Sequence, residues 1–177
     1  MLNIQKPFNL NIWITENRHL LKPPVGNKNL YIDSGDYIVM IVAGPNARKD
    51  YHYNETEELF YQLEGDIKVF IQENGERKEM DMHTGDMYLN PAKMPHSPVR
   101  SENSIGLVIE RKRAGKGFTD GLLWFCDNCN HKLHEVYFEL HNIEKDFLPH
   151  FKHFYQSEKL RTCEKCSTIM EVDSRFL

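Results

Sequence analysis

No stretch of this 177-residue sequence approaches the roughly 18 consecutive apolar residues that a membrane-spanning helix requires. The first seven residues, MLNIQKP, also lack the apolar centre of a secretory signal peptide. We therefore expect a cytoplasmic protein without a membrane partner. Because thiols stay reduced in that compartment, the four cysteines are expected to be metal ligands rather than disulfide partners.

The sequence also lacks an excess of basic residues. It contains 22 Lys and Arg against 26 Asp and Glu, which gives a formal net charge of -4. Such a balance provides no general attraction to nucleic acid or to an anionic surface. The basic segment at residues 111–117 is short and contains glycines, so we interpret it as an exposed connection and expect no nucleic-acid partner.

What the sequence does contain is a series of short β-branched and aromatic segments separated by turn residues. The segments predicted as strands are residues 30–32, 37–43, 59–63, 67–71, 78–82, 87–89 and 105–109. Residues 59–63 and 67–71 are predicted to pair as a hairpin through Gly65. A short helix is predicted over residues 8–21, with Asn9 as its N-cap. This spacing favours a mainly β protein, either a sandwich or a barrel.

Three residues beside these predicted strands have side chains that bind metals: His52, Glu58 and His96. Two imidazoles and one carboxylate are the ligand set of an iron site that keeps positions open for substrate and oxygen. His52 and Glu58 are separated by an even number of residues. If the chain between them stays extended, both side chains point to the same sheet face.

Three other residues offer the same donor atoms: Glu55, Glu57 and His83. The two glutamates lie at odd offsets from His52, which would place them on the opposite face of an extended strand. The histidine precedes a turn, whereas His96 begins a predicted strand. Glu58 and His96 are therefore the preferred ligands.

The cysteines form two Cys-x-x-Cys pairs, namely Cys126 with Cys129 and Cys163 with Cys166. Each pair can present two thiolates to one tetrahedral ion, so the spacing predicts a closed four-cysteine metal site that stabilises this part of the chain. Residues 134–140 are predicted as a strand and residues 146–155 as a helix. We expect a barrel domain over residues 1–113 and an extension over residues 114–177.

The predicted ligands belong to two longer motifs. The motif residues are Gly44, His52, Asn54, Glu58 and Gly65, then Gly85, Pro91 and His96. These motifs resemble those of the cupin superfamily, which implies a jelly-roll β-barrel. Asn54 stands where many cupins have a second histidine, and Lys93 stands where the second motif usually has glycine. The asparagine counts against a thiol dioxygenase; a sugar isomerase and a non-catalytic ligand-binding cupin are further alternatives.

Over nearly its whole length the sequence resembles a narrower group of cupins. The resemblance rests on WITENRHLLKPPVGN at residues 13–27, residues 50–61, PHSPVR at 95–100, GLVIERKR at 106–113 and the cysteine pairs. These segments are similar to the 3-hydroxyanthranilate 3,4-dioxygenase family, in the form with a rubredoxin-like four-cysteine tail. The resemblance implies a cytoplasmic homodimer that uses Fe(II) and O2 in an extradiol-type cleavage of 3-hydroxyanthranilate. The product, 2-amino-3-carboxymuconate semialdehyde, would serve quinolinate and NAD biosynthesis from tryptophan via kynurenine, or aromatic breakdown.

Carried over residue by residue, the resemblance also assigns a site. It places the catalytic iron ligands on His52, Glu58 and His96. It places the substrate-binding residues on Asn27, Arg48, Arg100 and Glu110, of which Arg48 and Glu110 are expected to act in catalysis. A second Fe or Zn is implied at Cys126, Cys129, Cys163 and Cys166. Asn130 and Ser167 replace the glycine that usually follows each cysteine pair.

Overall fold

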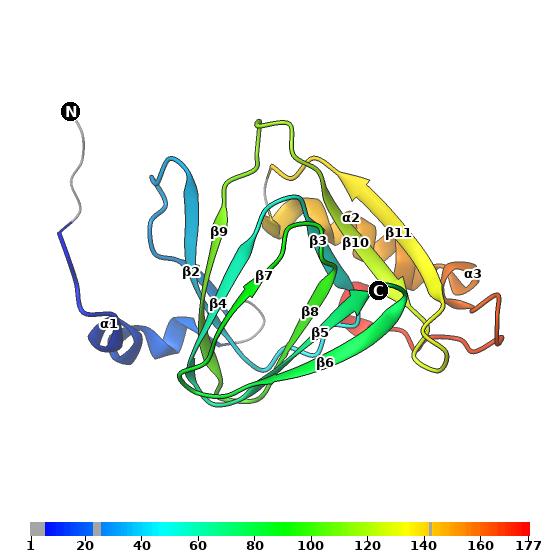
Figure 1. The fold of residues 1–177 in the computed structure, drawn as a ribbon, viewed down its shortest axis with the longest axis horizontal. Coiled ribbons are helices and arrows are strands. Elements are labelled where there is room, and N and C mark those ends of the chain that lie inside the picture. Colours follow the sequence, from blue (N-terminus) through cyan, green and yellow to red (C-terminus); the bar gives the residue numbers. More distant parts are fainter. Residues whose placement is uncertain (1–5, 23–25, 142) are drawn as a thin grey trace.

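The computed structural model describes residues 6–22, 26–141 and 143–177 (Figure 1). Its helices are α1 (Leu10–Asn17), η1 (Arg18–Leu20), α2 (Ile143–Gln156), α3 (Glu158–Arg161) and η2 (Ser174–Phe176). The first strands are β1 (Asn27–Asn29), β2 (Tyr37–Ala43), β3 (Tyr51–Asn54), β4 (Glu58–Glu64), β5 (Ile67–Glu73) and β6 (Glu76–Met82). The later strands are β7 (Met87–Asn90), β8 (His96–Arg100), β9 (Ile105–Arg111), β10 (Asp120–Phe125) and β11 (Lys132–Phe138).

Two antiparallel sheets face each other and form the body of the protein (Figure 1). The five-stranded sheet has the order β1-β2-β9-β4-β7, and the six-stranded sheet has the order β11-β10-β3-β8-β5-β6. Strands that follow one another in the chain often lie in different sheets, as in a double-sheet jelly roll. The expected mainly β, cupin-like fold is therefore confirmed.

Apolar side chains fill the space between the sheets because the strands alternate buried and exposed positions. The core residues are Met40, Phe60, Ile67, Val69, Ile71, Met82 and Val108. Each fully buried side chain of this kind contributes about 1.5–3 kcal/mol. Glu58 lies on the same inward face of β4 as Phe60, so the alternation also carries a carboxylate into the interior.

The predicted hairpin of residues 59–63 and 67–71 is wrong. β4 pairs with β7 and β9, whereas β5 pairs with β6 and β8. Gly65, with φ of 67°, lies where the chain passes from one sheet to the other. The tight hairpin is instead β5–β6, whose turn residues Asn74 and Gly75 have φ of 53° and 81°. Two successive positive φ values are typical of a type I′ turn.

The N-terminal predictions are partly confirmed. Asn9 caps α1 by accepting a hydrogen bond from the Ile12 backbone N–H at 3.1 Å. The regular helix is shorter than predicted, since a 3-10 turn follows α1. Residues 30–32 are not a strand, because Tyr31 and Ser34 form a turn. The predicted strand at 37–43 is confirmed as β2.

After residue 113, strands β10 and β11 extend the six-stranded sheet of the barrel, and the chain then leaves the sheet. β10 pairs with β3, with Leu122 opposite His52, and β11 pairs with β10. Helix α2, which contains Pro149, packs near these strands through a cluster that includes Trp124 and Phe154. The predicted strand and helix of this region are therefore confirmed as β11 and α2. The domain division at residue 113 stays a prediction, with β10 belonging to the barrel's six-stranded sheet.

The core predicts a sharp difference between two isoleucines. Ile67 is 3% exposed and Ile32 is 76% exposed. Ile67→Ala should lower the free energy of unfolding by about 2–5 kcal/mol, because it removes buried methyl groups and leaves a cavity. Ile32→Ala should change it by less than about 0.5 kcal/mol. Urea denaturation of both variants checks this, and equal losses would contradict the described core.

Candidate metal centre and substrate pocket

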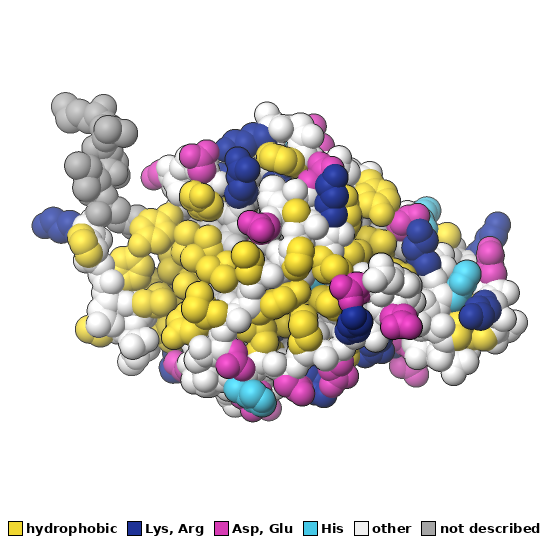
Figure 2. Space-filling view, viewed as in Figure 1, with side chains coloured by type: hydrophobic (Ala, Val, Ile, Leu, Met, Phe, Trp, Pro, Cys, Tyr) yellow, Lys and Arg dark blue, Asp and Glu magenta, His cyan; other side chains and the backbone are white. Residues whose placement is uncertain are grey.

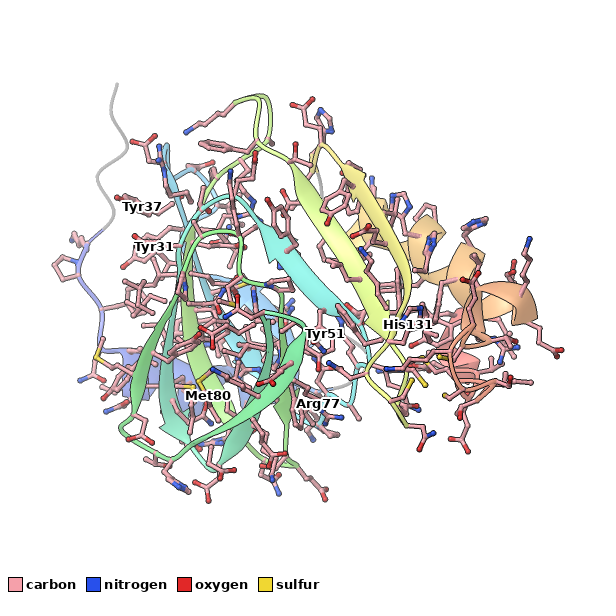
Figure 3. All side chains as sticks on the ribbon, turned by 45° about the vertical axis from the view of Figure 1, so that its right-hand side comes forward. Tyr31, Tyr37, Tyr51, Arg77, Met80 and His131 are labelled. Carbon is pink, nitrogen blue, oxygen red and sulfur yellow. The ribbon has the colours of Figure 1, made fainter. Side chains whose placement is uncertain are left out.

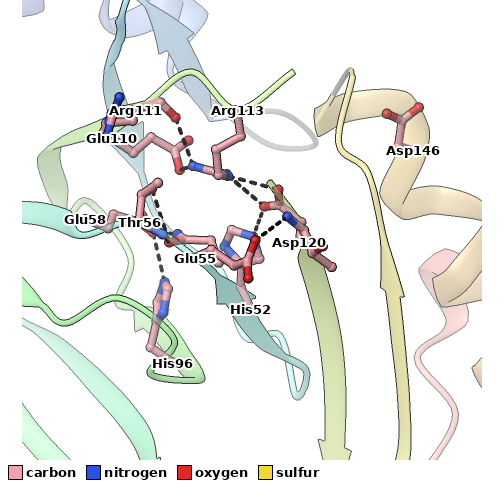
Figure 4. A network of polar contacts seen from close by, with 12 residues as sticks. His52, Glu55, Thr56, Glu58, His96, Glu110, Arg111, Arg113, Asp120 and Asp146 are labelled. Atoms are coloured by element: carbon pink, nitrogen blue, oxygen red, sulfur yellow. Dashed lines mark hydrogen bonds and ion pairs between the residues drawn. The ribbon is translucent and has the colours of Figure 1, made fainter. Parts of the chain in front are cut away.

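The three predicted iron ligands come together inside the barrel. His52 of β3 lies opposite His96 of β8 in the six-stranded sheet, and Glu58 begins β4 in the other sheet. One donor atom from each of the three lies within 4.8 Å of the others. His96 Nε2 is 3.1 Å from Glu58 Oε2 (Figure 4). Their assignment as ligands stays a prediction, but the geometry permits one ion to contact all three.

The reason given for pairing His52 with Glu58 is wrong. The chain turns between β3 and β4, so the even offset does not place the two side chains on one sheet face. They meet because the two sheets face each other across the interior. Among the alternatives, Glu57 is exposed, and Glu55 accepts a hydrogen bond from the Thr119 backbone N–H at 2.8 Å.

The remaining alternative, His83, also lies outside the cluster. Its imidazole is exposed and is 3.2 Å from the Asp66 carboxylate. Within the described residues, the His and carboxylate groups close enough to share one ion are His52, Glu58 and His96. The structure thus places none of the three alternatives beside the predicted ligands.

Burial and neighbouring charges set the protonation of these donors. Burial lowers the pKa of His52, which favours the neutral ring that ligates metals. Burial opposes ionisation of both Glu58 and His96, but their mutual attraction outweighs it, lowering the pKa of Glu58 to about 2 and raising the pKa of His96; a metal ion would replace the His96 proton. His96 Nδ1 lies 3.1 Å from the Met94 carbonyl oxygen, so an Nδ1–H can donate there and leave the Nε2 lone pair free. An ionised carboxylate with two imidazoles fits a divalent iron ion.

Two buried residues that the sequence analysis missed, Asp120 and Arg113, form hydrogen bonds with predicted site residues. Asp120 Oδ1 is 2.9 Å from His52 Nε2 (Figure 4). Arg113 donates to both Asp120 oxygens, at 2.8 and 2.9 Å, and to Glu110 Oε2 at 2.8 Å. The Arg113 guanidinium therefore binds Asp120, which contacts the predicted iron ligand His52, and it also binds Glu110, a predicted substrate-binding residue.

The burial of Arg113 corrects the interpretation of residues 111–117 as an exposed connection. Arg113 is 2% exposed, whereas Arg111 is exposed. In the sequence both belong to one basic run, which is usually solvated, so spacing gave no sign of the difference. The sequence contains one weak indication that Asp120 is buried. It immediately precedes the apolar segment 121–125, which forms a buried strand.

The four predicted substrate-binding residues line one cavity together with the three predicted iron ligands. Apolar side chains form its other walls: Met40, Val42, Phe60, Pro98, Val108 and Phe147. The remaining lining residues are Asn46 and Asp50. Such a mixed lining suits a small ligand that has an apolar body and a few polar groups.

Two side chains in this cavity have unused hydrogen-bonding atoms. Of the buried side-chain atoms in the described residues, four have no partner: Arg100 Nε and Nη1, Glu110 Oε1 and Trp124 Nε1. Burial lowers the pKa of Arg100 to about 10, so its guanidinium stays charged at neutral pH. Burial, reinforced by Glu58, raises the pKa of Glu110 to about 7. A buried cation without a partner is costly, which indicates that an anion completes the site.

Gly106 of β9 gives the Arg100 side chain its room. A Cβ at position 106 would lie 2.7 Å from Arg100 Nη1, closer than side-chain carbons normally approach. β8 and β9 lie in different sheets, so the guanidinium reaches across the barrel interior. The glycine is part of the motif GLVIERKR, and the close approach gives a physical reason for it.

The four cysteines form the second cluster of metal-binding groups. Cys126 Sγ is 3.5 Å from Cys166 Sγ, and Cys129 Sγ is 3.5 Å from Cys163 Sγ. Figure 3 shows sulfur atoms gathered beside the label of His131, whose carbonyl oxygen accepts a hydrogen bond from the Cys126 N–H at 2.8 Å. The residues after each pair, Asn130 and Ser167, have left-handed φ of 57° and 59°. They adopt the backbone that usually requires glycine, so the two departures leave the tetrathiolate arrangement intact.

The buried network predicts a large effect of losing Arg113. Arg113→Met should lower the free energy of unfolding by about 3–5 kcal/mol, because it leaves the Asp120 and Glu110 carboxylates buried without a cation. The control Arg111→Met changes an exposed neighbour and should cost less than about 1 kcal/mol. Urea denaturation compares the two, and similar midpoints would show that Arg113 does not hold the network.

Comparisons with known proteins agree with this arrangement. The sequence matches the 3-hydroxyanthranilic acid dioxygenase family over residues 1–155. It is 51% identical over 170 residues to 3-hydroxyanthranilate 3,4-dioxygenase of Xanthomonas campestris pv. campestris (strain 8004), covering 96% of this chain and 95% of that protein. It is 45% identical to the enzymes of that name from Burkholderia cenocepacia, covering 96% and 95%, and Bacillus thuringiensis (strain Al Hakam), covering 92% and 90%. The chain therefore belongs to the 3-hydroxyanthranilic acid dioxygenase family.

Proposed function

We propose that this protein is an Fe(II)-dependent dioxygenase that converts 3-hydroxyanthranilate and O2 to 2-amino-3-carboxymuconate semialdehyde. The observation that supports it most strongly is one cavity that holds the His52, Glu58 and His96 donors together with the unpartnered guanidinium of Arg100. The names of the curated relatives agree with this substrate and reaction. The open donor set beside Arg48, Arg100 and Glu110 argues against a non-catalytic cupin with a structural metal.

His52, Glu58 and His96 would hold the iron. Bound Fe(II) supplies open coordination positions for the ring substituents and O2, so that the two reactants are held in contact. The protein contributes an ionised Glu58, because its pKa is about 2, and a neutral His52. Asp120 and the Met94 carbonyl orient the two imidazoles, which fixes the direction of their lone pairs.

The substrate's own shape matches the remaining residues. A planar guanidinium can bind a carboxylate through two charge-assisted hydrogen bonds from one edge, and the Nε–Nη2 edge of Arg100, whose Nε has no partner, would serve that purpose. Phe60, Pro98 and Val108 can contact the aromatic ring. Asn27 would line the same pocket.

Glu110 and Arg48 would act on the reacting groups. Glu110 has a pKa of about 7 and a free Oε1, so it can accept a proton from the substrate hydroxyl or hydrogen-bond its amino group. Arg113 holds the other carboxylate oxygen, which fixes the direction of Oε1. Arg48 places a positive charge at the cavity wall, where it can stabilise negative charge that develops on oxygen.

We also propose that the second cluster binds Fe or Zn and that the protein is a cytoplasmic homodimer. Four cysteine sulfurs around one point suit either ion. Figure 2 shows hydrophobic side chains gathered over the five-stranded sheet, where Tyr37, Met87 and Leu89 are 55%, 64% and 51% exposed. A face of this kind suits contact with a second copy. Within the described residues, none of the helices is long and apolar enough to cross a membrane.

The product would enter quinolinate and NAD biosynthesis from tryptophan via kynurenine, or the breakdown of aromatic compounds. Both uses share this ring-opening reaction. The choice between them depends on the neighbouring enzymes of the cell rather than on this site.

The ligand assignment predicts that His96→Ala abolishes turnover and iron binding at the cavity. The matched control is His83→Ala, which alters an exposed histidine and should leave both unchanged. Each protein is reconstituted anaerobically with Fe(II), then mixed with 3-hydroxyanthranilate and air while oxygen uptake and product absorbance are recorded. Because the cysteine cluster can also bind iron, the metal content is compared with that of the wild type. Full turnover by the His96 variant would refute the assignment.

The carboxylate role predicts a selective defect in Arg100→Ala. Losing charge-assisted hydrogen bonds should raise the KM for 3-hydroxyanthranilate roughly 10- to 150-fold, since such bonds contribute about 1.5–3 kcal/mol. The analogue 2-aminophenol lacks the carboxylate, so the variant should process it about as well as the wild type does. Steady-state kinetics with both compounds checks this. Equal losses for the two would remove Arg100 from the carboxylate role.

A further inference from the structure

Helix α2, which lies between the two cysteine pairs in the sequence, contributes a wall to the cavity. Phe147 lines the cavity, and its ring centroid is 5.3 Å from that of His52. Phe151 lies one helical turn further along α2, and both rings are buried. They contact each other edge to face at 6.1 Å. The tail thus reaches the site through two aromatic side chains.

Both aromatic rings also contact Arg48. The centre of its guanidinium is 5.8 Å from the Phe147 ring centroid and 5.2 Å from the Phe151 ring centroid. Asp50 accepts hydrogen bonds from Nε, at 2.9 Å, and from Nη2. Among the hydrogen bonds of the described residues, Nη1 is therefore the nitrogen of Arg48 left for a ligand. A carboxylate holds one edge of the group, and π faces hold its plane.

Arg48 needs such support because of its place in the chain. It lies in the loop between β2 and β3, outside the ladders of both sheets. A long side chain on a loop has many conformations. Contacts that exclude the other conformations increase the population of the one that can bind a ligand. Asp50, which immediately precedes β3, supplies the carboxylate, and the two cation–π contacts come from α2.

The ring of Phe151 is itself fixed by the tail. Its centroid is 4.6 Å from that of Phe176 and 6.2 Å from that of Trp124. The neighbouring Phe154 belongs to the same apolar cluster and stacks on Trp124 at 4.4 Å. Phe154 is fully buried, but the cation–π contacts of Arg48 are with Phe147 and Phe151. The two phenylalanines therefore share a cluster and differ in their contact with Arg48.

We infer that Phe151 of α2, together with Phe147, is a positioning residue for Arg48, so that the cysteine-bearing tail completes the active site. The inference rests on the proposed function for the role of Arg48 in the reaction. It adds that the position of α2 sets the orientation of the guanidinium. A change confined to the tail should then alter turnover without touching a predicted iron ligand.

The test compares Phe151→Leu with Phe154→Leu as the matched control. Both remove an aromatic ring from the same face of the same cluster, and thermal denaturation measures how far each destabilises the fold. Phe151→Leu should lower kcat/KM for 3-hydroxyanthranilate about 5- to 30-fold, which is the range for a desolvated cation–π contact. Phe154→Leu should lower it less than about twofold. Phe151→Tyr keeps the π face and should restore most of the activity.

A second readout does not depend on turnover. The Nε–H signal of Arg48, identified by its loss in Arg48→Lys, should shift in the NMR spectrum of Phe151→Leu because the ring currents near it change. It should stay in place in Phe154→Leu. An unmoved signal, or activity losses that follow only the loss of stability in both variants, would overturn the inference. If the wild type itself shows no turnover, the proposed function fails, and the signal still decides whether α2 positions Arg48.

Discussion

The site depends on one constraint, which is that the two sheets face each other across the barrel interior. It sets His52 and His96, neighbours in one sheet, against Glu58 in the other. Within the five-stranded sheet, the register of β4 and β9 sets Glu110 beside Glu58. Carboxylates so deeply buried are expensive unless a cation is near. Arg113 meets that need on one side, and the donor set with Glu58 suits an iron ion on the other.

Much of this arrangement could be predicted from the sequence, and the failures have specific causes. Donor types and motif spacing indicate the candidate ligands, and neither depends on which sheet a strand joins. His52 and Glu58 do not share a sheet face because the chain between them turns, and the hairpin predicted at Gly65 is wrong because a turn between sheets can have the same residues as a turn within one. Arg113 was missed because a basic run is usually solvated and because its partner Asp120 lies seven residues further along the chain. Only the folded chain brings Asp120 to it.

Two elements after residue 113, β10 and α2, connect the cysteine-bearing tail with the candidate site in the barrel. β10 starts at Asp120, the acceptor of His52, and ends immediately before Cys126, so one strand connects the two metal-binding clusters. α2 returns across that strand and contributes Phe147 to the cavity. A structural metal at the cysteines would therefore stabilise an element that contacts the substrate pocket. The tail therefore contributes a wall to the candidate active site.

The most direct test of this account is an anomalous-scattering map at the iron edge, from crystals soaked anaerobically with Fe(II) and 3-hydroxyanthranilate. The account predicts an iron peak bounded by His52, Glu58 and His96, with the substrate carboxylate on Arg100 and the ring between the apolar walls. Iron at the cysteines but not at this site, or a substrate with its carboxylate turned away from Arg100, would contradict it.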